Sequence, residues 1–304
     1  MKNTEKYAGI FPAFYACYDD AGNTSPARIR AFARYLADKG VQGLYVGGSS
    51  GECIYLDKDE RKRTLEAVMD EVGGKLRVIA HVACNNTRDS MELAAHAASA
   101  GVDAIAAIPP IYFHLPPHAM RDYWNDISSA APNTDFVIYN IPQLAGVALT
   151  VPLLLEMKKN PRLVGVKNSS APVQDIQMFR DAGGDDFVVY NGPDEQLLSG
   201  LAAGASGGIG GTYAVMPELY LAIYRLYREG KMEQARLAQN EACRIIYAIC
   251  SAKGNLYSIE KALLKKRGMD IGGARKPLPA AAPEDAPVID RCTDLIAAAI
   301  ERYA

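Results

Sequence analysis

A lysine lies inside a short apolar stretch, LVGVKNS, that runs from Leu163 to Ser169. A β-branched stretch without polar alternation is typical of a strand buried on both faces. Burial disfavours the charged form of an amine, and proteins use such places to obtain a neutral lysine that attacks carbonyl carbons and forms a Schiff base. The alternative is a lysine at a strand end that reaches solvent or pairs with a carboxylate. Lys167 is therefore a candidate nucleophile.

A second stretch of the same kind, FVIYNIP, runs from Phe136 to Pro142 and carries Tyr139 near its end. A phenol at the end of a neighbouring strand can accept and return a proton. Tyr139 is therefore a candidate partner of the lysine.

Other polar side chains follow further strand-like stretches. Serine hydroxyls beside glycines, with their backbone N–H groups, can hold a carboxylate. Acidic side chains can accept hydrogen bonds from a ligand, and glycines permit close approach to the backbone. The candidates are the serines Ser49, Ser50 and Ser169, the acids Asp194 and Glu195, and the glycines Gly192 and Gly211. With the amine and the phenol, this set suits a keto-acid substrate whose ketone condenses with the lysine.

The elements that must position these residues alternate along the chain. Apolar, strand-like segments are expected at 9–16, 43–48, 77–82, 104–110, 136–142, 164–167, 187–191 and 207–210, and helical patterns such as 25–39, 57–72, 87–100 and 173–182 separate them. Eight such units predict a closed α/β barrel, the (β/α)8 or TIM barrel, with the chemistry at the carboxyl ends of the strands. An open doubly wound sheet would begin with a glycine-rich turn, which is missing after the first segment.

The strand signals stop after Pro217, and the rest of the chain is helical in pattern. We therefore expect a barrel over residues 1–216, which holds the active site, and a C-terminal helical layer over residues 217–304.

Composition limits the class of protein. The 304 residues carry a formal net charge of -2 and no long basic run, so nucleic acid is an unexpected partner. No stretch approaches the ~18 apolar residues of a membrane span, and the first residues, MKNTEK, lack the apolar core of a signal peptide. Six scattered cysteines without a CxxC pair favour reduced thiols. We expect a soluble, cytoplasmic protein without contact to a membrane.

The motifs GGSSGE, YNIP and GVKNS, in this order and spacing, resemble those of the pyruvate-dependent class I aldolases, the family of dihydrodipicolinate synthase and N-acetylneuraminate lyase. The resemblance implies that Lys167 forms the Schiff base and Tyr139 transfers the proton. It also implies that Ser49 and Ser50 bind the pyruvyl carboxylate, and that Tyr112 reaches a neighbouring site across a subunit interface. A homotetramer built as a dimer of dimers, and no cofactor or metal, are expected.

Within this family, the sequence resembles the lyase branch more than the synthase branch. The synthases follow YN(V/I)P closely with an arginine that binds the second carboxylate, and this chain has Leu144 there. It matches the lyase pattern YNIPxLxG, the NGPDE segment whose acids Asp194 and Glu195 bind sugar hydroxyls, and GIGGTY. The resemblance therefore implies cleavage of N-acetylneuraminate to N-acetylmannosamine and pyruvate.

Two positions depart from the lyase pattern. Ser169 stands where threonine is usual and keeps the hydroxyl, whereas Gly211 stands where a serine usually contacts the sialic acid chain. The alternatives are an aldolase or dehydratase for another 2-keto-3-deoxy sugar acid, then dihydrodipicolinate synthase, and, in another class, a non-catalytic keto-acid sensor.

One metal motif is discounted. His114 and His118 have the spacing of a helical metal-binding pair, but Pro116 and Pro117 between them argue against a helix through both.

Overall fold

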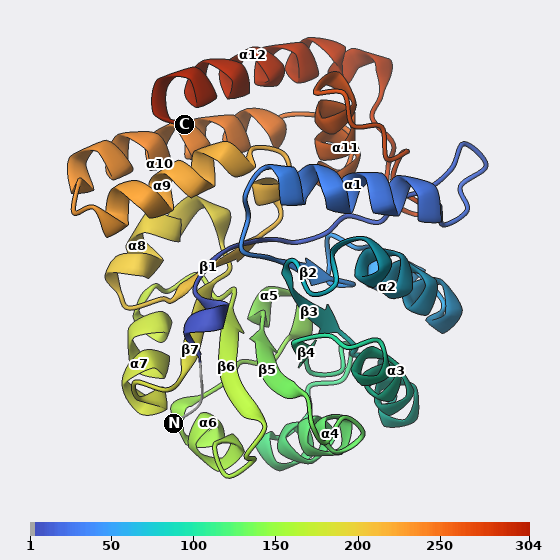
Figure 1. Cartoon of the computed structure of the whole chain (residues 1–304), viewed down its shortest axis with the longest axis vertical. Coiled ribbons are helices and arrows are strands. Elements are labelled where there is room, and N and C mark those ends of the chain that lie inside the picture. The colour runs from blue at the N-terminus through green and yellow to red at the C-terminus, as the bar shows by residue number, and fades with distance from the viewer. Residues whose placement is uncertain (1–3) are drawn as a thin grey trace.

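The computed structural model describes residues 4–304 and confirms the barrel. Eight strands lie parallel within this part of the chain and alternate with helices (Figure 1). The strands are β1 (Gly9–Pro12), β2 (Gly43–Val46), β3 (Arg77–His81), β4 (Ala104–Ala107), β5 (Asp135–Asn140), β6 (Leu163–Asn168), β7 (Val188–Asn191) and β8 (Gly207–Gly210).

The ladder runs in the order β1-β8-β7-β6-β5-β4-β3-β2, and backbone contacts close it between β1 and β2. The amide of Phe14 donates to the carbonyl of Tyr45 at 2.9 Å, and the amide of Gln42 donates to Ile10 at 3.1 Å. Closure leaves no open sheet edge and brings the carboxyl ends of all the strands to one rim.

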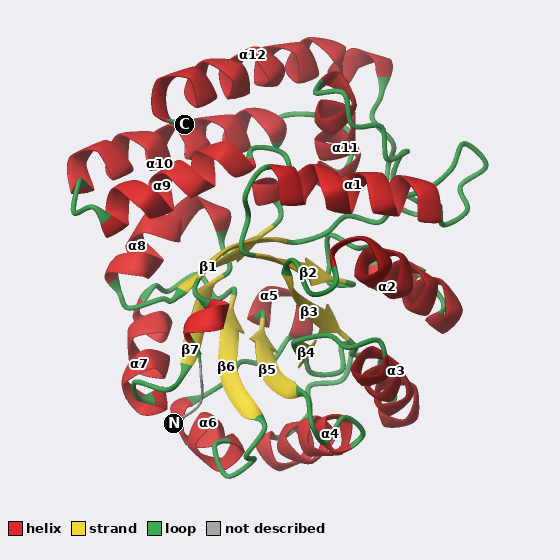
Figure 2. Cartoon of the chain, viewed as in Figure 1, coloured by secondary structure: helices red, strands yellow, loops and turns green. Residues whose placement is uncertain are grey.

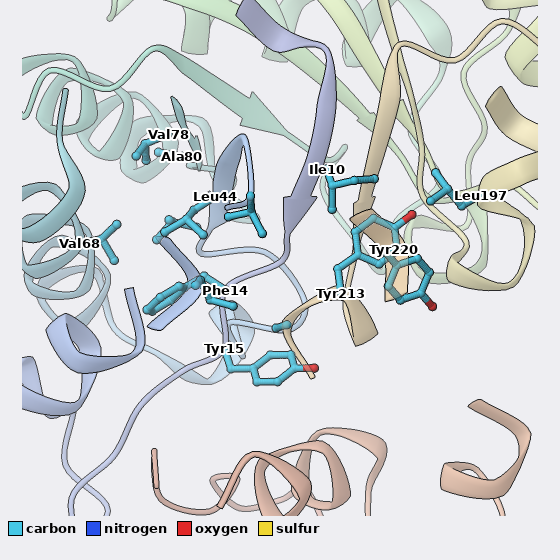
Figure 3. Close-up of a cluster of buried hydrophobic side chains, with 14 of the residues drawn as sticks. Ile10, Phe14, Tyr15, Leu44, Val68, Val78, Ala80, Leu197, Tyr213 and Tyr220 are labelled. Atoms are coloured by element: carbon cyan, nitrogen blue, oxygen red, sulfur yellow. The ribbon is translucent and has the colours of Figure 1, made fainter. Parts of the chain in front are cut away.

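Each strand buries both of its faces, as the apolar stretches predict. Phe11, Tyr45 and Ile79 point into the barrel. Their neighbours Ile10, Leu44 and Val78 belong to the layer between strands and helices (Figure 3). Because side chains alternate along a strand, a two-sided core requires the continuous apolar pattern seen in the sequence.

Helices surround the strands (Figure 2). They are α1 (Pro26–Asp38), α2 (Lys58–Val72), α3 (Thr87–Ser99), α4 (Pro117–Ser129), α5 (Pro142–Ala145), α6 (Val151–Met157), α7 (Gln174–Gly183) and α8 (Leu197–Ala202). Side-chain caps fix several starts: Asp57 forms a capping box with Glu60 at α2, and Ser25 and Asn86 cap α1 and α3. Short 3-10 turns are η1 (Glu5–Tyr7), η2 (Cys53–Tyr55), η3 (Asp194–Gln196), η4 (Thr212–Ala214) and η5 (Pro283–Asp285).

After β8 the described chain is helical, as expected. The helices are α9 (Pro217–Arg228), α10 (Met232–Ile249), α11 (Leu256–Lys266) and α12 (Ala286–Tyr303). In Figure 1, α9, α10 and α12 stack at one end of the molecule, and α9 also packs against β1 and α8. The division at residues 216 and 217 into two units stays a prediction. Within residues 4–304, no helix is long and apolar enough to cross a membrane.

Candidate active site

A cavity of about 530 Å³ opens at the carboxyl ends of the strands. All but one of the site residues predicted from the sequence line it: Ser49, Ser50, Tyr139, Lys167, Ser169, Gly192, Asp194, Glu195 and Gly211. The exception is Tyr112. Residues that are separated by up to 162 positions thus meet where barrel enzymes hold their chemistry.

Lys167 and Tyr139 are direct neighbours across two strands. β5 and β6 pair with Tyr139 opposite Lys167, so both side chains point into the barrel. The Nζ atom of Lys167 lies 3.9 Å from the ring centroid of Tyr139 and 4.4 Å from that of Tyr45. Lys167 is 5% exposed. A buried amine beside a phenol is the arrangement that nucleophilic attack with proton transfer requires.

Lys167 has no ion pair and no hydrogen bond within residues 4–304, although it is buried. The rings of Tyr139 and Tyr45 lie against its amine, and Asp194 acts on it through electrostatics without an ion pair. The alternative of a structural ion pair is therefore wrong for this lysine. An amine without a permanent hydrogen-bond partner is available for nucleophilic attack on a carbonyl carbon.

His81 supports the loop that carries Ser49 and Ser50. Gly47 has φ +77°, a conformation that favours glycine, and its carbonyl accepts a hydrogen bond from Nδ1 of His81 at 2.8 Å. Nε2 of His81 faces the amide of Ile108 at 3.4 Å. Burial, helped by the nearby Arg61, lowers the pKa of His81 to about 3. The imidazole is thus neutral at pH 7 and serves as a structural support.

A buried ion pair fixes the far end of the same loop. Glu52 has φ +51° and accepts from Nζ of Lys261 on α11 at 2.5 Å, with both side chains almost fully enclosed. The carboxylate also accepts from the hydroxyl of Tyr18 at 3.1 Å and from the amide of Arg275 at 2.9 Å. Three donors on one buried carboxylate provide the bonds that a buried charge needs.

Two asparagines tie the motifs YNIP and GVKNS together. Nδ2 of Asn140 donates to Oδ1 of Asn168 at 2.7 Å, and Oδ1 of Asn140 accepts from the amide of Leu149 at 2.9 Å. The amide of Ser169 donates to the carbonyl of Asn140 at 2.7 Å. Next to it, a Cβ on Gly192 would lie 2.0 Å from Oγ of Ser169, so this approach requires glycine. These contacts lock the ends of β5, β6 and β7 in register.

Asp194 is held by Thr212, which donates to one carboxylate oxygen through its amide at 2.7 Å and its hydroxyl at 2.6 Å. The hydroxyl of Tyr220 lies 2.7 Å from the Thr212 hydroxyl and can donate to it. Burial raises the pKa of Asp194 to about 6, against the opposing effect of the Thr212 bonds. The group is therefore mostly ionised at pH 7 and accepts hydrogen bonds.

Tyr112 lies outside the cavity of its own chain. It is 87% exposed and has φ +87°. The structure does not bring it to the other predicted residues, and its role across an interface stays a prediction. Leu144, the position of the synthase arginine, is exposed and lines the cavity.

Metal binding finds no support in the described chain. α4 begins at Pro117, so His114 lies outside the helix that holds His118, as the prolines indicate. Among residues 4–304, no group of three or more histidine, cysteine or acidic side chains could hold a metal ion.

The residues of one cavity wall were not predicted from the sequence. α10 contributes Tyr247, α11 contributes Tyr257 and Glu260, and Cys250 follows α10 directly. One signal was available: Glu260 stands among Leu256, Ile259 and Leu263 on the apolar stripe of α11. A charged residue type on a buried stripe is a candidate for function.

Comparison with known proteins agrees with this geometry. The chain is 58% identical over 304 residues to the N-acetylneuraminate lyase of Mediterraneibacter gnavus, covering 100% of this chain and 96% of that one. The structure of the wild-type sialic acid aldolase of Ruminococcus gnavus is 58% identical, with a TM-score of 0.97 and coverage of 98% of this chain and 100% of that one. CdNal of Clostridium difficile, solved with mannosamine, is 30% identical at a TM-score of 0.88, with 98% and 99% covered.

The model of the dihydrodipicolinate synthetase family matches residues 6–292, which is almost the whole chain. This match confirms the resemblance that the three motifs indicated. The chain belongs to the dihydrodipicolinate synthetase family.

Proposed function

We propose that this protein is a sialic acid aldolase that cleaves N-acetylneuraminate reversibly to N-acetylmannosamine and pyruvate. The observation that carries the proposal is the 58% identity over the full length to an N-acetylneuraminate lyase. The cavity supports it, because it holds an unpaired buried lysine beside a tyrosine together with two acids suited to hydroxyl groups.

In the mechanism that we propose, Lys167 attacks the C2 ketone of the open-chain sugar acid and expels water to form an imine. Ser49 and Ser50 hold the carboxylate next to that carbon. Tyr139 takes the proton of the C4 hydroxyl, the C3–C4 bond breaks, and N-acetylmannosamine leaves. The remaining enamine is protonated at C3, and water hydrolyses the imine to pyruvate and free Lys167. A relative at 57% identity, also from Ruminococcus gnavus, was solved as a catalytic lysine mutant, which supports a lysine nucleophile here.

Asp194 and Glu195 are proposed to bind the hydroxylated chain of the substrate, and Ser169 and Gly192 to shape the wall beside the imine. An anionic pair of side chains attracts hydroxyl donors and repels a second carboxylate. Leu144 stands at the position of the synthase arginine, whose guanidinium would bind a second carboxylate. This replacement also argues against a second carboxylate in the substrate.

The test is release of pyruvate from N-acetylneuraminate, coupled to lactate dehydrogenase, with Lys167→Ala as control. We expect turnover of about 1–1000 per second, lost in the variant. Pyruvate trapped on Lys167 by borohydride, without cleavage of N-acetylneuraminate, would instead indicate an aldolase for another 2-keto-3-deoxy sugar acid. Neither trapping nor turnover would indicate a non-catalytic sensor.

We propose a homotetramer, a dimer of dimers, as the active form. Exposed apolar side chains gather near the mouth of the cavity: Ile54 and Leu144 line one hollow of about 470 Å³, and Tyr112 and Phe113 follow Ile111 at its edge. Contiguous exposed apolar surface marks interaction sites. Light scattering after size exclusion tests the proposal, and a monomeric mass for the active enzyme would contradict it.

We also propose that the enzyme works in the cytoplasm. All six cysteines lie within the described residues and carry free thiols, which suits a reducing compartment. Fractionation of the producing cells tests this.

A further inference from the structure

Glu260 on α11 is a fully buried acid. Neither of its carboxyl oxygens has a described partner at hydrogen-bond distance, although the nearby Tyr15 hydroxyl favours its charged form. Two other buried acids of this chain, Glu52 and Asp285, have hydrogen-bond donors. Glu52 pairs with Lys261, and Asp285 accepts from three backbone amides. A buried polar group without a partner costs free energy, so its presence requires an explanation.

The position of Glu260 explains why an acid without a partner is present there, since Glu260 lines the active-site cavity. Two residues connect it to the substrate side. Tyr15 lies beside the Glu260 carboxyl and donates its hydroxyl to the carbonyl of Gly211 at 2.7 Å. Asp194, which also lines the cavity, acts electrostatically on Glu260. Glu260 thus faces the same part of the cavity as Gly211 and Asp194.

The surroundings of the carboxyl favour its neutral form, because burial and the negative Asp194 together raise the pKa of Glu260 well above its usual range. A neutral carboxyl has one O–H donor and a carbonyl acceptor, whereas the ionised Asp194 only accepts. The two acids therefore offer complementary bonds to a hydroxylated ligand.

Residue 211 has no side chain, which leaves space beside Ser50 and Asp194. A Cβ on Gly211 would lie 3.3 Å from Oγ of Ser50 and 4.0 Å from Oδ2 of Asp194, so a side chain here would stand between the serine loop and the acid. Without it, a substrate hydroxyl can approach the wall that α11 forms.

We propose that Glu260 is a specificity-determining residue that hydrogen-bonds a hydroxyl of the sugar-derived part of the substrate, in the space that Gly211 leaves open. The inference rests on the proposed function. It assigns to α11 a direct contact with the aldehyde-derived half of the substrate and none with the pyruvyl half, which Lys167 and the serine loop hold.

Synthesis from pyruvate and N-acetylmannosamine separates the two halves, because each has its own KM. In Glu260→Met the donor and acceptor are lost, and we expect the KM for N-acetylmannosamine to rise about 2- to 12-fold, the value of one neutral hydrogen bond. The KM for pyruvate, and trapping of pyruvate by borohydride, should stay within about twofold of wild type.

Two further variants serve as controls. Glu260→Gln keeps a neutral donor and acceptor in place and should recover most of the lost affinity for N-acetylmannosamine. Leu263→Met alters the same helix at a buried residue that does not line the cavity, and should leave both KM values unchanged.

Each other outcome counts against the proposal. Unchanged KM values in Glu260→Met would show that Glu260 makes no substrate contact. Parallel rises for both substrates in Glu260→Met and Glu260→Gln would show a structural role only. Wild type that makes no N-acetylneuraminate would overturn the proposed function and this inference with it, whereas active wild type with insensitive variants overturns the inference alone.

Discussion

Two buried lysines of this protein have opposite surroundings. Lys167 is 5% exposed and lies over the rings of Tyr139 and Tyr45 without an ion pair among the described residues. Lys261 is 1% exposed and also lies over a tyrosine ring, yet it bonds Glu52 at 2.5 Å and the carbonyl of Gly273 at 2.8 Å. Burial alone therefore does not distinguish a reactive amine from a structural one.

The difference lies in the partners. An amine whose protons are committed to a carboxylate has no lone pair to offer, and removing it leaves a buried negative charge. An amine that faces only aromatic rings can lose its proton to a neighbour and attack a carbonyl. The comparison thus separates a lysine that holds the serine loop from one that performs chemistry beside it.

Replacing each lysine by methionine tests most directly whether one is reactive and the other structural. Lys167→Met should lose turnover by more than about 10³-fold, because no other amine can form the imine. Its thermal midpoint should match or exceed that of wild type, since no hydrogen bond or ion pair of the described residues is lost. Coupled pyruvate release and thermal unfolding check both expectations, and a large loss of stability would contradict the role assigned to this residue.

Lys261→Met should instead lower the stability of the protein. Removal of one member of a buried ion pair typically costs about 3–5 kcal/mol, because the other charge stays buried. The free energy of unfolding in urea should fall by that amount. The double variant Glu52→Gln with Lys261→Met removes both charges and should recover part of the loss. A single variant as stable as wild type would show that this ion pair does not hold the loop.

Tyr139→Phe tests whether the hydroxyl next to Lys167 transfers the proton. The ring under the amine remains, so the packing around Nζ is preserved, and only the hydroxyl is lost. Imine formation with pyruvate should persist in borohydride trapping, whereas turnover should fall about 10²–10⁴-fold. Unchanged turnover would remove Tyr139 from the proton transfer.

The sequence predicted the barrel because each strand needs two apolar faces, and this pattern differs from that of a half-exposed sheet. The strand ends were less predictable. The apolar segment 9–16 predicted a longer strand than β1, which ends at Pro12. Contact with β2 continues to Phe14, and residues 15–18 stay buried beyond it, so burial continued where pairing with the barrel stopped.

The site was predictable where its residues follow strands, since barrel geometry brings strand ends together. It was not predictable where a helix from elsewhere closes it. The pair of Glu52 and Lys261 joins residues 209 positions apart, and the lysine gives no local sign of its partner. Glu260 showed only as an acid on an apolar stripe, and Tyr112 acquires its predicted role only with a second subunit.

The smallest predicted effect concerns Asp194, the acid that lines the same cavity as Lys167. With a pKa of about 6, Asp194 is ionised at pH 7 and becomes protonated as the pH falls. A protonated carboxyl no longer attracts hydroxyl donors as a carboxylate does, so kcat/KM for N-acetylneuraminate should fall as the pH drops through about 6. At pH 5 the loss should be about tenfold.

Two variants identify the group that causes this inflection. Asp194→Asn should lower kcat/KM at pH 7 and remove the inflection, whereas Glu260→Gln should leave it in place. His81 is excluded as the cause because its pKa of about 3 lies well below this range. If the inflection persists in Asp194→Asn, another group controls binding.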